Sequence, residues 1–523
     1  MSERARANRV LVMNTLAFTV CFAAWMMNGV LITFLVDNGV FDWNRAQVGW
    51  LIGVPVLTGA VMRLPMGVLT DRNGGRIVFT ALMVIAAVPM YLVSHADTYF
   101  EFLLGGLGFG LTGASFAVGV AYTSLWFPAE RQGTVLGIFA MGNAGAALTA
   151  MGAPMLLNML TDDGADLDGW RMLPRLYAAL LLASAALFWL LTATKKVERA
   201  QGALGARLAP LRDVRVWRFG LYYFFLFGGF VALSQWLIPY YVNMYSLSVA
   251  SAGLMATVFA LPAGLTRALG GWMSDKWGPR AILYAVFGAS IVILILLFPP
   301  RMEIQAPGEG VVAQRPGTVT AVSEREIIVG DDRYQLQSSA QPGEDQIGVR
   351  LGPPDGEEKG ILIFPSASFR QEPVVQAGDT VEIGQLLARG TTRIFFQANV
   401  WIFTGLVFLL GVTLGLGSAA VFKHIPSYFP ADVGTVGGIV GVLGGLGGFF
   451  SPIIFSYLLQ ATGIWTTSWM VLALVGTACL VWMHLVVQRM MRARVPVLMR
   501  QIEEDSDTYL EGGRQPGSPG GPQ

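Results

Sequence analysis

The chain has 523 residues, of which 54% are hydrophobic before its 63 glycines are counted and only 13% are charged. A soluble globular protein carries roughly 25% charged residues, so the composition excludes a soluble enzyme. The formal net charge of +1 gives no reason to expect nucleic acid as a partner. Cys21 and Cys479 lie far apart in apolar runs, so we expect neither a disulfide framework nor a metal site. We also expect no cofactor.

Apolar runs long enough to cross a bilayer recur along the chain. A hydrocarbon core about 30 Å thick requires roughly 20 mostly apolar helical residues. The sequence predicts twelve transmembrane helices, near residues 10–36, 46–70, 77–94, 99–126, 132–160, 172–193, 217–243, 250–274, 281–299, 398–425, 434–460 and 466–488. The first run is far longer than the apolar part of a signal peptide and a second span follows it, so we expect a retained helix.

The distribution of Lys and Arg predicts the orientation. One set of helix ends carries most of them: Arg4, Arg6, Arg9, Arg72, Arg76, Arg131, Lys195, Lys196, Arg199, Arg207, Arg212, Arg215, Arg218, Lys276, Arg280, Lys423, Arg489, Arg492, Arg494 and Arg500. The opposite short loops carry only Arg45, Arg171 and Arg175, and four aspartates gather there, at positions 162, 163, 166 and 168. Because Lys and Arg favour cytoplasmic loops, we expect both termini in the cytoplasm.

The apolar pattern stops between the ninth and tenth spans. Residues 302–396 are instead rich in Pro, Gly, Asp and Glu, with short alternating segments. Odd-numbered spans run outward, so this insert is predicted to lie outside the membrane. It holds fourteen acidic and eight basic residues, a net charge of −6, which leaves +7 for the rest of the chain.

Two internal repeats divide the membrane part into halves. Gly67-Val-Leu-Thr-Asp71-Arg72-Asn-Gly74-Gly-Arg76 recurs 204 residues later as Gly271-Trp-Met-Ser-Asp275-Lys276-Trp-Gly278-Pro-Arg280, and Gly133-Thr-Val-Leu-Gly137-Ile138 recurs 301 residues later as Gly434-Thr-Val-Gly-Gly438-Ile439. The offsets differ by 97 residues, close to the length of the insert. The chain therefore reads as two six-helix halves with a separate domain lodged in the second.

These motifs resemble a known family. The G-x-L-x-D-x-x-G-x-R loop resembles the hallmark of the major facilitator superfamily, and the glycine-rich segments 137–154 and 437–452 are similar to the two signatures of its nitrate/nitrite porters. The resemblance implies an all-α membrane fold of twelve helices, with a small all-β barrel-like domain inserted. The domain boundaries we expect are 1–195 for the N-terminal half, 196–216 for a cytoplasmic linker, 217–301 and 397–490 for the C-terminal half, 302–396 for the periplasmic insert and 491–523 for a disordered cytoplasmic tail.

Two arginines lie inside apolar spans. Arg63 and Arg267 are related by the repeat and stand roughly two turns before the charged loops. A charge at such a depth costs about 2.5–3.5 kcal/mol and normally faces the bundle interior and a partner. No Asp or Glu falls in the middle of any predicted span. The missing partner is then a small exchangeable anion. The planar guanidinium fork suits a flat oxyanion such as nitrate or nitrite, although an arginine can also snorkel to the headgroups.

The family resemblance implies further site residues. Asn143 matches a substrate-facing asparagine, Tyr223 and Phe227 match a pocket tyrosine and phenylalanine, and Phe116 matches another pocket aromatic. We expect Gly142 and Gly441, in the two glycine-rich spans, to supply backbone beside the anion. Such strips of small residues also suit either tight static packing or sliding. The resemblance assigns the charged loop residues to a conformational latch: Asp71, Arg72, Arg76, Asp275, Lys276 and Arg280.

The insert resembles a lipoyl/biotinyl-type β barrel. Segment 374–390 looks like the second half of such a domain, and 306–312 resembles its opening strand and turn. Its only lysine, Lys359, lies between Glu358 and Gly360, which is not the sequence context of a modified carrier lysine. We therefore expect a structural domain or one that docks an unknown periplasmic partner.

Several functional alternatives remain open. A biotin-dependent ion pump would need a modified lysine and carboxylates in the spans, and an anion sensor would use the transporter fold without flux. For a transporter, His95, His424 and His484 lie near span ends, so no midmembrane proton carrier is obvious, which favours nitrate/nitrite exchange. Trp25-Met-Met and Pro55-Val-Leu-Thr-Gly59 resemble the proton-symport branch instead. We predict proton-coupled nitrate uptake by a monomer in contact with lipid in the bacterial inner membrane, with exchange as the alternative.

Overall fold

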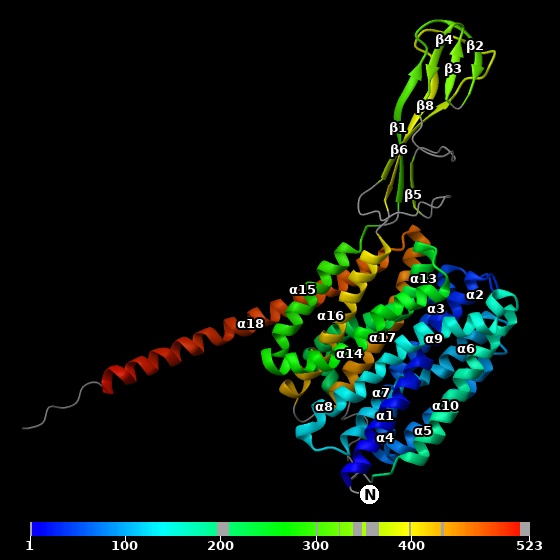
Figure 1. Cartoon of the computed structure of the whole chain (residues 1–523). Coiled ribbons are helices and arrows are strands. Elements are labelled where there is room, and N and C mark those ends of the chain that lie inside the picture. The colour runs from blue at the N-terminus through cyan, green and yellow to red at the C-terminus, as the bar shows by residue number, and fades with distance from the viewer. Residues whose placement is uncertain are drawn as a thin grey trace, which may run out of the picture.

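The protein is a helical bundle with a β-sheet region standing on one end. The computed structural model describes residues 3–195, 209–299, 302–323, 325–337, 348–351, 366–396, 399–429 and 433–512. Within these ranges twelve helical segments are long and apolar enough to cross a membrane, which confirms the predicted spans. Figure 1 shows the N-terminus at one end of the bundle and the strands projecting from the other. We call these the terminal end and the insert end.

The first half supplies six spans, several of which contain short irregular segments. Its helices are α1 (Glu3–Trp25), α2 (Met27–Asp37), α3 (Arg45–Val61), α4 (Arg63–Asn73), α5 (Gly75–Val93), α6 (Tyr99–Phe109), η1 (Gly110–Ala114), α7 (Ser115–Ser124), α8 (Ala129–Ala140), η2 (Met141–Ala144), α9 (Gly145–Leu160), η3 (Asp162–Gly164), η4 (Leu167–Arg171) and α10 (Met172–Leu191).

The second half supplies the other six spans. Its helices are η5 (Ala209–Arg212), α12 (Val214–Tyr223), η6 (Phe224–Gly228), α13 (Gly229–Tyr245), α14 (Val249–Trp277), α15 (Pro279–Leu296), α16 (Val400–Tyr428), α17 (Val433–Thr462) and α18 (Thr467–Gly512). Most of their buried side chains join those of the first half in one hydrophobic core. Since polar backbone groups must be paired inside the bilayer, helices are the expected element for these apolar runs.

The repeated charged loops have the same backbone turn in both halves. Gly74 ends α4 with φ 84° and ψ 144°, and Gly278 ends α14 with φ 81° and ψ 139°. L side chains rarely adopt a positive φ of this kind, whereas glycine does so at little cost. The matched glycines therefore explain why the loop motif recurs at a fixed offset.

The insert folds into two four-stranded sheets. Its strands are β1 (Met302–Val312), β2 (Gly317–Val322), β3 (Glu326–Val329), β4 (Asp332–Gln335), β5 (Gly348–Leu351), β6 (Ser366–Pro373), β7 (Thr380–Val381) and β8 (Leu386–Phe396). The strand orders are β5-β1-β8-β6 and β4-β3-β2-β7, and every described pair is antiparallel. A small separate core holds this region, with Val319, Ile327, Val381 and Leu387 among its members.

The insert is all-β, as expected, and its described strands form no closed barrel. β5 and β6 remain edges of the first sheet, and β4 and β7 remain edges of the second. Register shifts between Gly308 and Val312 interrupt the long β1–β8 pair, and such bulges bend a strand and increase its twist. Residues of both sheets still pack into one core. Lys359 lies outside the described residues.

The tail differs from expectation as well. Residues 491–523 were expected to be disordered, but α18 continues to Gly512 and extends away from the bundle (Figure 1). Apart from Pro496, the run up to residue 510 contains neither Pro nor Gly, the two residues least compatible with a helix interior, and they concentrate only from Gly512 onward. Residues 513–523 and the linker residues 196–208 lie outside the described part of the chain.

The two halves meet tightly at the insert end. A Cβ atom at Gly253 of α14 would lie 2.1 Å from the Ala150 carbonyl oxygen of α9. Likewise, Arg45 of α3 donates from Nη1 to the Leu459 carbonyl of α17 at 3.1 Å. A Cβ would not fit at Gly253, so this glycine allows the close approach of α9 and α14, and we refer to these two contacts between the halves as the seal of the insert end.

This seal predicts the effect of one methyl group. Gly253→Ala should force α9 and α14 apart, so that a cysteine replacing the nearby buried Ala147 reacts faster with a water-soluble maleimide. Gly271→Ala on the same helix is the matched control, because no atom lies within 4 Å of its added Cβ. Equal labelling of the two variants, in a background lacking Cys21 and Cys479, would contradict the proposed seal.

Candidate functional site

The bundle brings the two predicted arginines to one aromatic ring. Arg63 is the first residue of α4, directly after the break at Met62, and Arg267 lies within α14. Their side chains are only 2% and 7% exposed. The guanidinium carbons lie 4.8 Å and 5.1 Å from the centre of the Phe227 ring. The two positive charges are close enough to repel one another.

The hydrogen bonds of these arginines are incomplete. Arg63 donates from Nη1 to the Gly441 carbonyl at 2.7 Å and from Nε to the Gly113 carbonyl at 3.5 Å. Its Nη2, and Nε and Nη2 of Arg267, are buried with no hydrogen-bond partner among the described residues. A buried charged donor without an acceptor is costly. Neither arginine forms an ion pair within the described part of the chain. The site is therefore a buried cluster of positive charge without a counter-ion among the described residues.

Aromatic rings surround the guanidinium groups. Tyr223 stacks on Phe227 with ring centres 5.0 Å apart, and it interacts electrostatically with both arginines. Phe116 lies 5.6 Å from the Arg63 guanidinium carbon, so the structure places these three predicted aromatics at the arginine pair. Cation–π contacts of this kind stabilise a desolvated guanidinium by up to about 2 kcal/mol.

Two further aromatics were not predicted. Trp25 lies 5.8 Å from Arg63, and Phe230 lies 5.4 Å from Arg267, measured from the guanidinium carbon to the ring centre. Phe230 is one turn after the predicted Phe227, so helical spacing could have identified it. Nothing in the sequence of the first span singles out Trp25 as a contact of Arg63.

Sequence reasoning also missed three departures from α-helical geometry beside the arginines. A π-helical segment, η6, contains Phe227, and two 3₁₀ segments, η1 and η2, contain Gly113 and Asn143. Irregular helical turns redirect backbone carbonyls and side chains, and they frequently mark functional sites. The glycines around 110–113 and 142–145 are the signal that could have located two of them.

Asn143 and the two predicted glycines occupy different surroundings. Asn143 is fully buried, donates from Nδ2 to the Ala140 carbonyl at 2.6 Å, and has no partner for Oδ1 among the described residues. A Cβ added to Gly264, one turn before Arg267 on α14, would lie 3.4 Å from the carbonyl carbon of Asn143. Gly441 borders Arg63, whereas Gly142 packs against the Phe18 ring. Asn143 and Gly441 thus lie beside the arginine-bearing helices, and Gly142 contacts an aromatic side chain.

The predicted latch residues lie at the terminal end, away from the arginine pair. Their described contacts stay within one half: Arg76 donates to the Trp189 carbonyl, Asp275 forms an ion pair with Lys423, and Arg280 donates to the Tyr428 hydroxyl.

The other three latch residues also have described positions. Lys276 lies over the rings of Trp272 and Trp277, Arg72 is exposed and Asp71 is half-buried. Their assignment to a latch remains a prediction.

Comparison with known proteins identifies the family. The Major Facilitator Superfamily profile matches residues 14–305. A probable nitrate/nitrite antiporter NarK1 of Thermus thermophilus is 37% identical over 511 residues, which cover 97% of each chain. The nitrite extrusion protein of Bacillus subtilis is 26% identical, covering 91% of this chain and 94% of its own.

A solved structure supports the fold. The crystal structure of a bacterial homolog to the human lysosomal transporter Spinster, in an inward-facing and occupied conformation, superposes with a TM-score of 0.58 at 14% identity, covering 92% of this chain and 97% of that one. The twelve spans and the two symmetry-related arginines fit the superfamily profile and these relatives. The chain therefore belongs to the nitrate/nitrite porter family of the major facilitator superfamily.

Proposed function

We propose that this protein moves nitrate and nitrite by alternating access, with the anion held between Arg63 and Arg267. As a member of its family it is a multi-pass bacterial membrane transporter. The observation that carries the proposal is the pair of buried guanidinium groups with three unpartnered nitrogens and no described carboxylate partner. A flat monovalent oxyanion supplies the missing acceptors, and an arginine fork can grip two of its oxygens at once.

The surrounding groups suit the same ligand. Tyr223 adds a hydroxyl beside the guanidinium groups, and Phe227 provides an apolar wall in contact with both. Burial strengthens each charged hydrogen bond because the local dielectric is low. The same walls exclude water, which would otherwise solvate the arginines and weaken their hold on a singly charged anion.

The topology belongs to the proposal as well. The excess of Lys and Arg at the terminal end supports cytoplasmic termini, and it puts the sheets of the insert outside. The insert end, where the two halves are sealed, would then be the outer side. The anion would reach the arginines from the cytoplasm in this conformation.

Two coupling modes each have an observation in their favour. Nitrate/nitrite exchange is supported by the arginine pair itself, because neither Arg63 nor Arg267 has a described ion-pair partner that could carry a proton. The Thermus thermophilus relative is also named an antiporter. Proton-coupled uptake is supported by the resemblance of the segments at Trp25 and Pro55 to the proton-symport branch of the family.

The arginine site predicts a strong effect of charge-conserving substitutions. Arg63→Lys and Arg267→Lys should each lower nitrate flux into liposomes at least about tenfold, because one ammonium group cannot replace a bidentate guanidinium. Arg492→Lys, at an exposed position on α18, is the control and should transport like the wild type. Normal nitrate flux in either buried-site variant would refute the two-arginine site.

The coupling mode can be separated in the same liposomes. Exchange predicts that external nitrate enters only vesicles loaded with nitrite or nitrate, and that a pH step has no effect on empty ones. Proton coupling predicts uptake into empty vesicles when the outside is made acidic, with internal acidification reported by a trapped dye. Uptake by empty vesicles under that gradient would exclude obligatory exchange.

The position of Tyr223 can be tested by substituting Gly444, which packs against the Tyr223 ring. A Cβ at Gly444 would lie 2.2 Å from the Tyr223 ring, whereas a Cβ at Gly437 would lie 3.6 Å from Phe422, an ordinary contact. Gly444→Ala should therefore displace Tyr223 and raise the KM for nitrate about fivefold, the loss of one neutral hydrogen bond. Gly437→Ala serves as the control, and Tyr223→Phe should match Gly444→Ala. If the KM for nitrate were unchanged in both Gly444→Ala and Tyr223→Phe, Tyr223 would not contribute to nitrate binding.

A further inference from the structure

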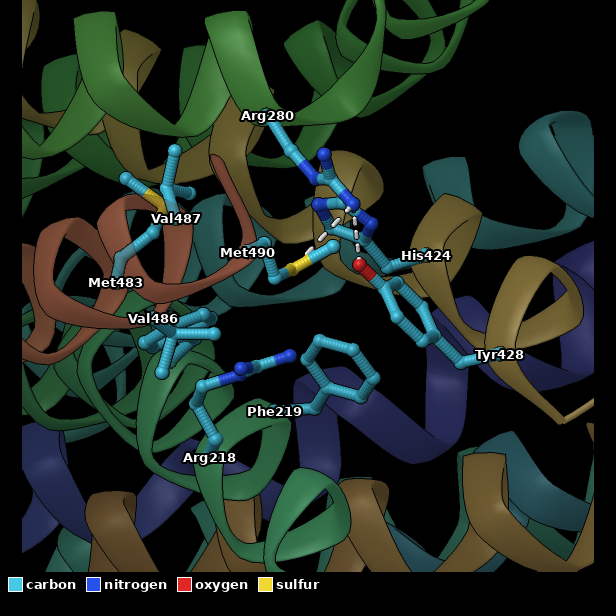
Figure 2. A pocket seen from close by; sticks show the side chains of 10 residues that line it. Arg218, Phe219, Arg280, His424, Tyr428, Met483, Val486, Val487 and Met490 are labelled. Carbon is cyan, nitrogen blue, oxygen red and sulfur yellow. Dashed lines mark hydrogen bonds between the residues drawn. The ribbon is translucent and has the colours of Figure 1, made fainter. Parts of the chain in front are cut away.

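A second basic pocket lies between α12, α15, α16 and α18, all in the second half of the chain. Figure 2 shows Arg218 and Phe219 reaching into it from α12, Arg280 from α15, and His424 and Tyr428 from α16. These residues are distinct from the arginine pair that faces Phe227. Arg280 is also one of the predicted latch residues, but the proposed transport function gives no role to the other residues of this pocket.

The Arg218 side chain lacks a counter-ion. It is only 8% exposed, and its guanidinium carbon lies 5.1 Å from the Phe219 ring centre. Among the described residues it has neither a hydrogen-bond acceptor nor an ion-pair partner. An arginine residue that is more than nine-tenths buried and lines a pocket without a described acceptor indicates a ligand that is negatively charged.

A second arginine faces the same space with weak partners. Arg280 donates from Nη2 to the Tyr428 hydroxyl and, at 4.0 Å, to the Met490 sulfur. Phenol and thioether groups are neutral and the latter is a poor acceptor. His424 stacks on Phe219 with ring centres 5.6 Å apart, and both arginines act electrostatically on it. The described part of the pocket thus concentrates positive charge and contains no carboxylate.

The pocket lies at the depth of lipid headgroups. Arg218 and Arg280 stand near the starts of spans Val214–Tyr245 and Pro279–Leu296, and Met490 stands near the end of span Thr467–Arg492. All three positions are at the terminal end of the bundle, where the apolar runs give way to charged residues. Phosphate groups of a bilayer lie at this boundary.

One wall of the pocket is apolar and runs along a helix. Met483, Val487 and Met490 follow at spacings of four and three residues on α18, so they form one stripe that leads from the basic residues into the span. Trp217, next to Arg218, is 48% exposed, as is typical of a tryptophan at a membrane interface. This apolar stripe would make no favourable contact with a soluble anion, whereas an acyl chain can pack against it.

We infer that this pocket binds the phosphate of an anionic phospholipid, with Arg218 and Arg280 on the phosphate oxygens and an acyl chain along the α18 stripe. Arginine matches phosphate through two parallel donors. A bound lipid would join four helices of the second half at the terminal end. Free inorganic phosphate shares the recognised chemistry but lacks the chain, which allows an experiment to distinguish the two.

Native mass spectrometry of the purified full-length protein tests the inference. After delipidation, the wild type should bind one phosphatidylglycerol at least about tenfold more tightly than phosphatidylcholine with the same acyl chains. Arg218→Gln and Arg280→Gln should each weaken phosphatidylglycerol binding about tenfold, the loss of a charged hydrogen-bonded partner, and Arg218→Lys should restore part of it. Arg489→Gln removes an exposed charge of α18 outside the pocket and should leave binding unchanged.

Three outcomes would overturn the inference. If both glutamine variants bound phosphatidylglycerol as tightly as the wild type, the two arginines would not form the lipid site. Equal binding of phosphatidylcholine would remove the preference for net negative charge. Displacement of the lipid by an excess of inorganic phosphate would indicate a soluble-anion site. Gel filtration and retained nitrate binding show that each variant is folded, and because nitrate binding is measured separately, failure of this inference is distinct from failure of the transport proposal.

Discussion

The burial of two positive charges without carboxylates is the constraint on which the rest of the bundle depends. Arg63 and Arg267 are almost completely buried, and among the described residues they contact carbonyl oxygens, aromatic faces and the Tyr223 hydroxyl but form no ion pair with a carboxylate. Such groups offset part of the desolvation cost of a guanidinium but not its charge. A carboxylate would neutralise the site permanently and compete with any anion. The incomplete compensation keeps the site open to a small ligand of opposite charge.

The irregular helical segments are the local solution to this constraint. A regular α-helix directs its carbonyls along its own axis into its own hydrogen bonds, so a neighbouring helix can only share them. The 3₁₀ turn η1 releases the Gly113 carbonyl toward Arg63, and the π segment η6 sets Phe227 between the two guanidinium groups. A Cβ at Gly445 of α17 would lie 2.6 Å from the Ala60 Cβ of α3, so this glycine lets α17 approach the first half closely, and the Gly441 carbonyl on the same helix accepts a hydrogen bond from Arg63. Packing and charge compensation therefore involve the same helix.

The sequence was sufficient for features that depend on composition and repetition, and insufficient for those that depend on tertiary contacts. Twelve apolar runs and the arginine pair were predictable because lipid imposes strong rules on length and charge. The contact of Tyr223 and Phe227 with the arginines followed only through family resemblance. The helix irregularities and Trp25 escaped prediction because hydrophobic periodicity does not report hydrogen bonds between helices. The absence of a closed barrel among the described strands was not predictable either, because local strand patterns do not determine whether two distant edges pair. The helical extension to Gly512 escaped prediction because a polar segment whose one proline is Pro496 can still continue a helix.

The hydrogen bond between Arg63 and Gly441 joins the two halves of the molecule. If the protein works by alternating access as proposed, the halves separate on one side of the site at a time, and this bond would break when the site opens across it. An empty protein that broke it would strand a buried donor, whereas a bound anion could accept from that donor. The barrier to reorientation would then be higher without cargo than with it. On this proposal, a single backbone carbonyl would act against slippage, the return of an unloaded carrier.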